Sequence, residues 1–358
     1  LAADLMRPAA AGTLLAVAVV VGGLAQLLLL VVAARRAGLA PPLLRPRLSP
    51  EVMRLLRLGL PGVLSGALAE INVVIGTVVA SSTAGAVSWL YFADRLHQLP
   101  LGVVGIAVGQ VLLPEIAHRI AAGDEAAGRE VQNRALEFAL ALALPAALAL
   151  VLLAEPIVLV LFERGAFTAT DRIAAAEALA IFAAGLPAFV LGRVFAPAFF
   201  AREDTRTPMA VAAVAVAVNV AAALSLEPVV GWIAVAIATT LAGWVSAAGL
   251  FALLVKRGHW CGDADLARRL PRLALAAVAM AAVVFAAEHL LAGVFDPHRP
   301  LLVTGGALAG LVVLGLAVYA GLVLALGVVD PARLRALVAA RRDRPDPEVP
   351  CSRPEDAA

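Results

Sequence analysis

The chain has 358 residues, of which 62% are hydrophobic and 15% are charged, a composition outside the usual range of soluble globular domains. Its 28 basic and 26 acidic side chains leave a formal net charge of +2, so no excess of charge indicates nucleic acid as a partner. The only cysteines, Cys261 and Cys351, fall in segments that we place in the cytoplasm, where thiols stay reduced. We therefore expect no disulfide and no cysteine metal site.

Apolar runs of about 20 residues recur along the whole chain, which is typical of bilayer-spanning helices. They predict an all-α polytopic membrane helix bundle with nine transmembrane helices, at residues 11–34, 58–81, 86–114, 134–154, 173–200, 208–226, 229–255, 270–293 and 300–327. Membrane helices tolerate isolated prolines because neighbouring groups satisfy the freed carbonyls. We therefore expect kinks rather than helix ends at Pro100, Pro145, Pro187 and Pro197.

The first run is too long for the core of a signal peptide and is followed by Arg35 and Arg36, so we interpret it as a true span in a truncated chain.

The orientation of the predicted spans follows from the connections between them, because short basic loops stay in the cytoplasm. One alternating set of connections, with the tail, holds 22 of the 28 basic residues, and the opposite set holds four. This pattern predicts that residue 1 lies outside and that the C-terminus is cytoplasmic.

The connection 35–57 precedes the second span. Ser49 can cap a helix, Pro50 suits its first position, and Val52, Leu55 and Leu56 would form one apolar face. The segment is either a short amphipathic helix on the inner membrane surface or a simple basic loop that sets the topology. At the other end of the chain, residues 328–358 are expected to form a disordered cytoplasmic tail.

Arg95 is the polar residue within the predicted spans that most strongly indicates a functional role. It lies about ten residues into the third span, too deep to be a snorkelling end residue, and an arginine near the bilayer centre costs about 2.5–3.5 kcal/mol on insertion scales. Asp94 points about 100° away on a helix, so a local ion pair is not expected. Arg95 either pairs with a carboxylate or carbonyl of another helix or binds an anion, because a guanidinium matches phosphate oxygens bidentately.

The same span continues with Gly102, Gly105 and Gly109, which share one helix face. This face predicts close approach of another backbone, and a glycine-rich helix can also bend during alternating access. Arg193 is the second arginine inside a predicted span, about two turns from the cytoplasmic end of the fifth. It either snorkels to the membrane surface or has a substrate or gating role.

Other polar groups inside the predicted spans are Glu70, Asn72, Asn219, Thr239 and Thr240. Such oxygen ligands can hold a coupling cation, and they can equally form hydrogen bonds between helices. The five histidines are scattered, no cluster of Cys and His ligands occurs, and no glycine-rich loop joins a strand to a helix. We therefore expect no catalytic residue, no bound metal or cofactor, and no enzyme activity.

Several separate stretches resemble the MurJ/MviN lipid II flippases of the multidrug/oligosaccharidyl-lipid/polysaccharide exporter superfamily. They match in order and spacing from about residue 10 to 255, and the last two spans match by hydropathy alone. The ADRL and DTRTP motifs are the most specific. The stretches are 60–66 (LPGVLSG), 80–82 (ASS), 87–96 (VSWLYFADRL), 101–107 (LGVVGIA), 111–115 (VLLPE), 161–168 (LFERGAFT) and 196–208 (APAFFAREDTRTP).

The resemblance implies a two-lobed fold of fourteen helices, with this chain corresponding to spans six to fourteen. Residues 1–34 would be the last span of the N-terminal lobe, 35–57 the cytoplasmic linker, 58–255 the transport helices of the C-terminal lobe, and 256–327 two final spans with a groove for a lipid tail. Some relatives carry an acidic residue where this chain has Gly76, so sodium coupling at that position is not expected.

The resemblance also implies a function. The family moves a lipid-linked precursor of peptidoglycan, undecaprenyl-diphosphate-linked disaccharide-pentapeptide, from the inner to the outer leaflet of the bacterial plasma membrane. Arg95 matches a family arginine thought to hold the diphosphate, and Arg193 falls where relatives often have a basic residue. Implied partners are this lipid, membrane lipids and cell-wall synthesis proteins. The alternatives are a related exporter of drugs or polysaccharide-linked lipid and a non-transporting scaffold for cell-wall synthesis.

Overall fold

The computed structural model describes residues 8–38, 50, 52–53, 59, 70, 72–297 and 299–328, and every regular element among them is a helix. The chain separates into two compact units, Leu1–Leu56 and Arg57–Ala358, which are described one by one. The first contains α2, Pro8–Arg36, with two arginines in its last turn. The predicted amphipathic helix at 49–57 and the first part of the 58–81 span lie largely outside the described residues, and the tail beyond 328 lies wholly outside them.

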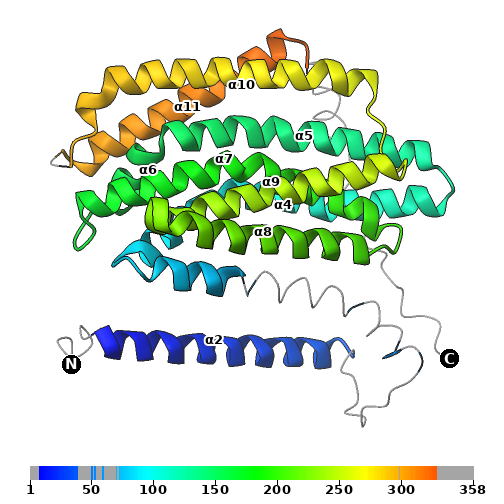
Figure 1. The fold of residues 1–358 in the computed structure, drawn as a ribbon, viewed down its shortest axis with the longest axis horizontal. Helices are drawn as coiled ribbons and strands as arrows, with labels where there is room; N and C mark the ends of the chain where they lie inside the picture. Colours follow the sequence, from blue (N-terminus) through cyan, green and yellow to red (C-terminus); the bar gives the residue numbers. More distant parts are fainter. Residues whose placement is uncertain are drawn as a thin grey trace, which may run out of the picture. The chain divides into compact units, whose positions relative to one another are not determined.

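The second unit is a bundle of long helices that run back and forth (Figure 1). Residues 72–80 are helical. The helices that follow are α4 (Ala86–Ala121), α5 (Glu125–Leu152), α6 (Ala154–Phe162), α7 (Ala169–Phe200), α8 (Arg206–Val230), α9 (Ala234–Lys256), α10 (Ala264–Leu291) and α11 (Leu301–Ala325), with 3-10 turns at Gly231–Ile233 and Ala292–Val294.

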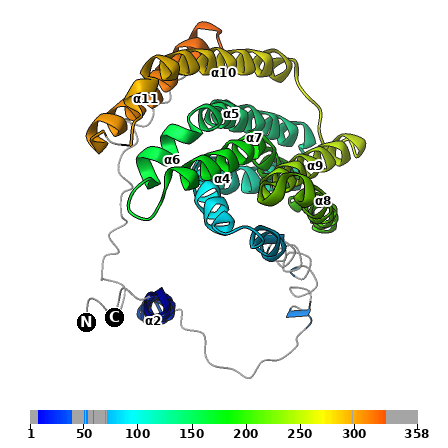
Figure 2. The ribbon, with the colours of Figure 1, turned by 60° about the vertical axis from the view of Figure 1, so that its left-hand side comes forward.

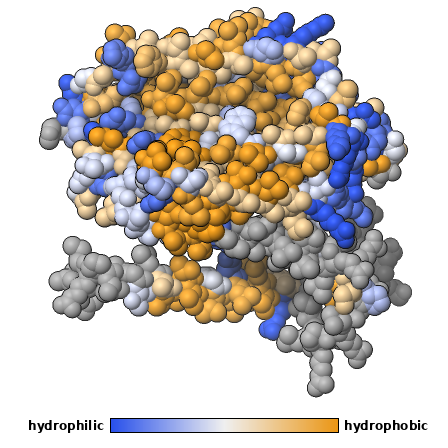
Figure 3. Space-filling model, viewed as in Figure 1, coloured by the Kyte–Doolittle hydropathy of each residue, from blue (hydrophilic) through white to orange (hydrophobic). Residues whose placement is uncertain are grey.

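Six stretches of the described residues are long and apolar enough to cross a membrane. In the second unit, hydrophobic side chains form a broad band over the middle of the helices and hydrophilic ones gather toward the helix ends (Figure 3). These features confirm an all-helical bundle of a polytopic membrane protein. The stretches are Ala16–Arg36, Glu125–Leu152, Ala169–Phe200, Arg206–Lys256, which contains both α8 and α9, Ala264–Val294 and Leu301–Ala325.

Several helices begin before the predicted spans because capping side chains, rather than hydropathy, set their first residues. Asp124 caps α5 by accepting from the backbone N–H of Ala127, and Asp263 caps α10 in the same way through Leu266. Thr168 and Asp171 form a reciprocal capping box at the start of α7. The polar first turns therefore extend α5, α7 and α10 beyond the apolar runs that the sequence marks.

The four prolines expected to kink helices rather than end them lie inside continuous helices. Pro100 is in α4, Pro145 in α5, and both Pro187 and Pro197 in α7. The prediction that the helices continue through these prolines is confirmed. A break does occur at Leu153, which is buried and separates α5 from the short α6, an element that was not predicted from the sequence.

Helix α7 is the centre of the bundle. In its most apolar stretch 61% of the residues are buried, against 11–28% for the other candidate spans of this unit. It packs against α4, α5, α6 and α9, while α10 and α11 form an outer layer on α5 and α6 (Figure 2). Buried side chains of α7 contribute to core clusters with both α4 and α9.

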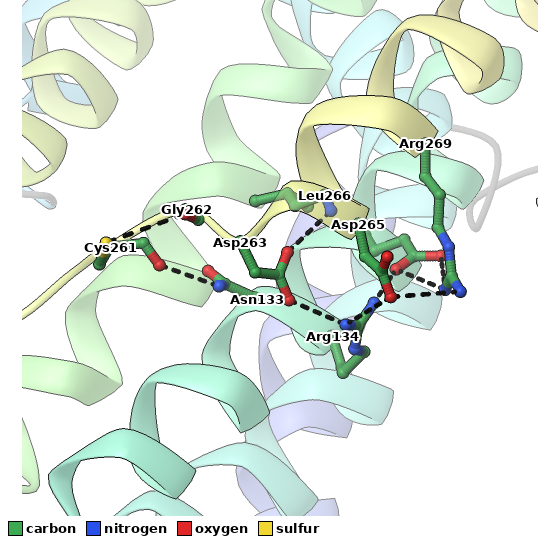
Figure 4. Close-up of polar contacts among 9 residues, drawn as sticks. Asn133, Arg134, Cys261, Gly262, Asp263, Asp265, Leu266 and Arg269 are labelled. Atoms are coloured by element: carbon green, nitrogen blue, oxygen red, sulfur yellow. Dashed lines mark hydrogen bonds and ion pairs between the residues drawn. The ribbon is translucent and has the colours of Figure 1, made fainter.

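Ion pairs hold the start of α10 against α5 (Figure 4). Arg134 of α5 lies 2.8 Å from Asp263, and Arg269 of α10 lies 2.9 Å from Glu137. Glu137 also accepts from Arg134 at 2.9 Å, so one partly buried carboxylate serves both arginines. Asn133 adds a hydrogen bond of 3.0 Å to the carbonyl of Cys261.

Further contacts join the connections that the sequence places on one side of the membrane. Arg202, after α7, pairs with Glu125 at the start of α5 at 2.5 Å. Arg257, after α9, donates to Asp204 and also to the Thr207 hydroxyl, the latter at 2.8 Å. The connections that follow α4, α7 and α9 therefore lie together at one end of the bundle, as an alternating topology requires.

Candidate functional site

Arg95 lies on an exposed face of α4. Its guanidinium carbon lies 4.8 Å from the centre of the Tyr91 ring, a cation–π distance, and Nη1 lies 3.4 Å from Oε1 of Gln98. Asp94 accepts from the Gln98 amide rather than from Arg95. Among the residues that the structure describes, Arg95 forms no ion pair. Its direct contacts are neutral side chains one turn away on either side, Gln98 links it to the Asp94 carboxylate, and the exposed guanidinium can be reached by an external anion.

Arg193 of α7 points into a cavity of about 710 Å³. The cavity is open to the surface, so Arg193 is exposed in it, and its lining comes from α4, α7, α8, α9 and the start of the helix at 72–80. Within the described part of the chain, Arg193 makes no ion pair, and no acidic side chain lines the cavity. An arginine in this position is a strong attractor for an anion, because few other groups offset its charge.

Gly105 of α4 makes room for Arg193. A Cβ atom added at Gly105 would lie 2.1 Å from Nη1 and 3.0 Å from Cζ of Arg193. At Gly102 an added Cβ would meet nothing within 4 Å. Gly105 therefore makes room for a side chain of the facing helix, whereas the corresponding space at Gly102 is open, and the prediction that this face admits another backbone stays a prediction.

Three of the predicted polar residues share the cavity with Arg193. Asn219 of α8 donates to the hydroxyl of Thr239 on α9 over 3.2 Å, and both line the cavity. Asn72 also lines it, and its buried Oδ1 has no hydrogen-bond partner in the described structure. The cavity thus combines one cation with neutral amide and hydroxyl groups, a set of donors suited to the oxygens of an anionic group.

Other predicted residues lie elsewhere. Thr240 donates to the carbonyl of Ile181 on α7 at 2.9 Å, so it links two helices. Glu70 is exposed and is not among the cavity-lining residues, and neither is Arg95. The structure therefore does not bring Arg95 and Arg193 into one pocket. No group of three His, Cys, Asp or Glu side chains suited to a metal occurs within the described ranges.

Sequence reasoning missed His97, although it directly follows the ADRL motif. It is only 4% exposed, and its ring lies 5.3 Å from Phe189 and 6.0 Å from Phe182 of α7, measured between ring centres. Its position two residues after Arg95, inside an otherwise apolar span, was the available signal. A buried imidazole next to the cationic cavity is a titratable group at the interface of α4 and α7.

A second cavity, of about 400 Å³, lies between α4, α5, α10 and α11. Its walls are almost wholly apolar, with Pro100, Ala149, Leu153, Met280 and Leu316 among them. The Tyr319 hydroxyl, its main polar group, already donates to the carbonyl of Ala141 at 2.8 Å. Such a cavity suits a hydrocarbon chain.

Comparison with known protein families gives a match to the family described as "Lipid II flippase MurJ" over residues 2–304. The probable lipid II flippase MurJ of Rhizobium meliloti (strain 1021) is 47% identical over 304 residues, which cover 85% of this chain and 57% of that protein. The corresponding protein of Rhizobium tropici is 43% identical, with 87% of this chain and 58% of that protein covered. The chain thus spans somewhat more than half the length of these relatives.

Among solved structures, the chain is similar to one titled "Lipid II flippase MurJ, inward closed conformation". The TM-score is 0.63 at 22% sequence identity, and the match covers 82% of this chain and 57% of that one. At this level of identity the likeness establishes the fold alone. The helices described above therefore have the arrangement of part of that transporter.

Proposed function

The chain belongs to the MurJ family of lipid II flippases, and on that premise we propose that the protein containing it moves the lipid-linked peptidoglycan precursor across the bacterial plasma membrane. The substrate would be undecaprenyl-diphosphate-linked disaccharide-pentapeptide, carried from the inner to the outer leaflet. Membership in a family of flippases also supports the prediction that the protein is not an enzyme.

The observation that carries this proposal is the state of Arg95. A guanidinium on a helix of the membrane-embedded bundle, held by Tyr91 and Gln98 but by no carboxylate in the described structure, can pair with the oxygens of a diphosphate. Arg193 offers a second cation on the neighbouring helix. In alternating access these cations would capture the headgroup from the inner leaflet, and rocking of the two lobes would expose it to the outside.

The fold of the whole protein would be the two-lobed bundle of fourteen helices, with nine spans in this chain. Residues 1–34 would end the N-terminal lobe, 58–255 would form the transport helices of the C-terminal lobe, and the C-terminus would be cytoplasmic. The topology is supported by contacts among the basic connections, such as Arg202 with Glu125 and Arg257 with Asp204. Short basic connections are retained on the cytoplasmic side.

The apolar cavity between α4, α5, α10 and α11 would receive part of the polyprenyl tail. Its wall of leucine, alanine and methionine side chains offers no group that would compete for the diphosphate. The tail would therefore remain in an apolar environment while the headgroup crosses, which avoids the cost of exposing isoprenoid units to water. A drug–proton exporter is less well supported, because the cavity at Arg193 is lined by no carboxylate among the described residues.

The proposed function is tested by complementation of a bacterium depleted of its own lipid II flippase. The complete gene is expressed as wild type, Arg95→Ala, Arg95→Lys and, as a matched control, Arg119→Ala. Arg119 lies on the same helix, and its one ion pair among the described residues is with Glu115 on an exposed face. At equal membrane abundance, wild type and Arg119→Ala should restore growth and Arg95→Ala should not. Failure of the wild type to restore growth would overturn the proposal.

A further inference from the structure

Another cavity, of about 420 Å³, lies where α9 and α10 separate. Helix α9 packs on α7 and α8, whereas α10 packs on α5 and α11, and the connection 257–263 joins the two helices (Figure 2). Leu140 of α5 and Phe195 of α7 form part of the floor. On α9 the lining runs from Trp244 to Phe251, so the cavity extends about 10 Å along that helix by the rise per residue.

The cavity is a groove that opens sideways. Trp244 and Phe251 on one wall are 44% and 37% exposed, and Ala267 on the opposite wall is also exposed. Both walls belong to stretches long and apolar enough to cross a membrane, so the open side faces lipid. Asp263 is the charged residue of the described lining, and its carboxylate pairs with Arg134 at 2.8 Å. The rest of the groove offers an apolar surface to a hydrocarbon chain.

The end of the groove at the connection 257–263 carries an unused hydrogen-bond donor. Trp260 lines the groove and packs edge-on against Phe251, with ring centres 4.9 Å apart. Its indole Nε1 is buried and has no hydrogen-bond partner among the described residues. Buried polar groups are normally paired, and tryptophan favours the boundary between hydrocarbon and headgroups. A connection between the ends of two spans lies at that boundary, where a lipid carries its ester and phosphate oxygens.

The helix ends beside this donor are positively charged. Residues 256–272 contain five basic and two acidic side chains. Lys256, the last residue of α9, and Arg268, near the start of α10, are exposed and form no ion pair within the described part of the chain. Basic pockets between membrane helices on the cytoplasmic side bind anionic lipid headgroups. Charge complementarity therefore favours an anionic lipid over a zwitterionic one.

We propose that the groove between α9 and α10 binds one anionic glycerophospholipid of the cytoplasmic leaflet. One acyl chain lies in the groove, an ester or phosphate oxygen accepts from Nε1 of Trp260, and the headgroup lies between Lys256 and Arg268. The groove shares no lining residue with the cavity at Arg193 or with the apolar cavity at Tyr319. The site is therefore independent of the lipid that the protein transports.

The test uses the complete protein in phosphatidylcholine liposomes that contain a small amount of phosphatidylglycerol with a photoactivatable diazirine in one acyl chain. After illumination, mass spectrometry locates the labelled peptides. Ala248→Phe and Ala267→Phe fill the groove from its two exposed walls, and two variants guard against misfolding of one. Ala317→Phe is the matched control, because Ala317 is exposed on α11 and does not line the groove.

The headgroup is tested with a phosphatidylcholine probe that carries the same diazirine chain. The charge variant combines Lys256→Gln with Arg268→Gln. Its control is Arg206→Gln, since Arg206 is an exposed arginine at the start of α8 without an ion pair among the described residues. Unlabelled undecaprenyl phosphate is added as a competitor, because a polyprenyl chain is the other apolar chain that could enter the groove.

In the wild type, the phosphatidylglycerol probe should label α9 and α10 about tenfold more than the phosphatidylcholine probe, the preference expected from two basic residues at an anionic surface. Both groove-filling variants should lose this labelling, and the Ala317 and Arg206 variants should keep it. The charge variant should label equally with the two probes. The inference is wrong if either folded groove-filling variant labels like its control, if the wild type does not distinguish the probes, if the charge variant keeps the preference, or if undecaprenyl phosphate displaces the phosphatidylglycerol probe.

Discussion

The guanidinium of Arg193 occupies the space that a side chain at Gly105 would need, with Nη1 only 2.1 Å from the position of a Cβ atom there. The two residues lie on different helices, α7 and α4. The direction of Arg193 into the cavity therefore depends on the absence of a methyl group on the facing helix.

Gly105→Ala should displace Arg193 while leaving the bundle folded, because the group that must move is the far end of a flexible side chain. The affinity for P1,P2-dimethyl diphosphate should fall about tenfold, close to the loss of one charge-assisted hydrogen bond. Gly102→Ala is the matched control, since a Cβ there meets nothing within 4 Å. Equal affinities of the two variants, measured by calorimetry, would show that Arg193 does not need Gly105.

Asp204 should make the stability of the protein depend on pH in the acid range. Partial burial by itself would raise the pKa of the Asp204 carboxyl, but hydrogen bonds from Thr207 and Arg257 outweigh it and hold the pKa below the ordinary 3.8. Since the folded state favours the ionised form, its stabilising contribution is complete above that ordinary value and is lost as the pH falls through the lower pKa of the folded state.

Thermal unfolding of wild type and Asp204→Asn between pH 7 and pH 3 measures this contribution. The wild type should have a Tm several degrees higher at pH 7, and the difference should shrink as the pH approaches 3. A difference that stays constant over this range would mean that the variant acts through packing rather than through the charge of Asp204.

Glu137 should be the most important carboxylate at the junction of α5 and α10, because it accepts from both Arg134 and Arg269. Glu137→Gln should lower the free energy of unfolding by about 1–3 kcal/mol, the usual range for hydrogen bonds to partly buried charged groups. Glu115→Gln is the control, since its pair with Arg119 is exposed and such pairs contribute about 0–1 kcal/mol. Thermal unfolding that is equally affected by both changes would contradict this role of Glu137.

Filling the apolar cavity should weaken binding of the lipid tail without changing binding of the diphosphate headgroup. Ala149→Phe places a large side chain in the cavity and should weaken binding of a long polyprenyl diphosphate while leaving P1,P2-dimethyl diphosphate unaffected. Leu302→Phe serves as the control, because Leu302 is 90% exposed on α11. Unchanged binding of the long-chain lipid by Ala149→Phe would exclude this cavity as the site of the tail.

Hydropathy was sufficient to predict the class of fold, because the apolar runs coincide with helices of the bundle. It did not predict where those helices begin, since α5 and α10 start at Asp124 and Asp263, whose side chains cap polar first turns outside the apolar runs. The break at Leu153 was also missed, although its signal is local. Glu155 and Pro156 follow it, and Pro156, which lacks the N–H that would bond the carbonyl of Leu152, suits the first turn of a new helix.

The candidate site was predicted one residue at a time. The cost of burying charge singles out Arg95 and Arg193 from the sequence. Whether such residues share a pocket depends on how several helices pack. The grouping of Arg193 with Asn72 and Asn219, and the exclusion of Arg95 from that cavity, could therefore not be predicted. The contact of Gly105 with Arg193 could not be predicted for the same reason, because the identity of its neighbour on α7 is a property of the fold.

The most direct test of the central claim is transport of the fluorescent lipid-linked precursor by the complete protein in liposomes. A membrane-impermeant quencher measures the fraction of headgroups on the far side over time. Wild type and Arg119→Ala should move the lipid, and Arg95→Ala, at equal protein content, should move it at no more than about a tenth of that rate, the loss expected for one charge-assisted contact with the diphosphate. Transport by Arg95→Ala at the rate of the wild type would contradict the claim that Arg95 binds the headgroup.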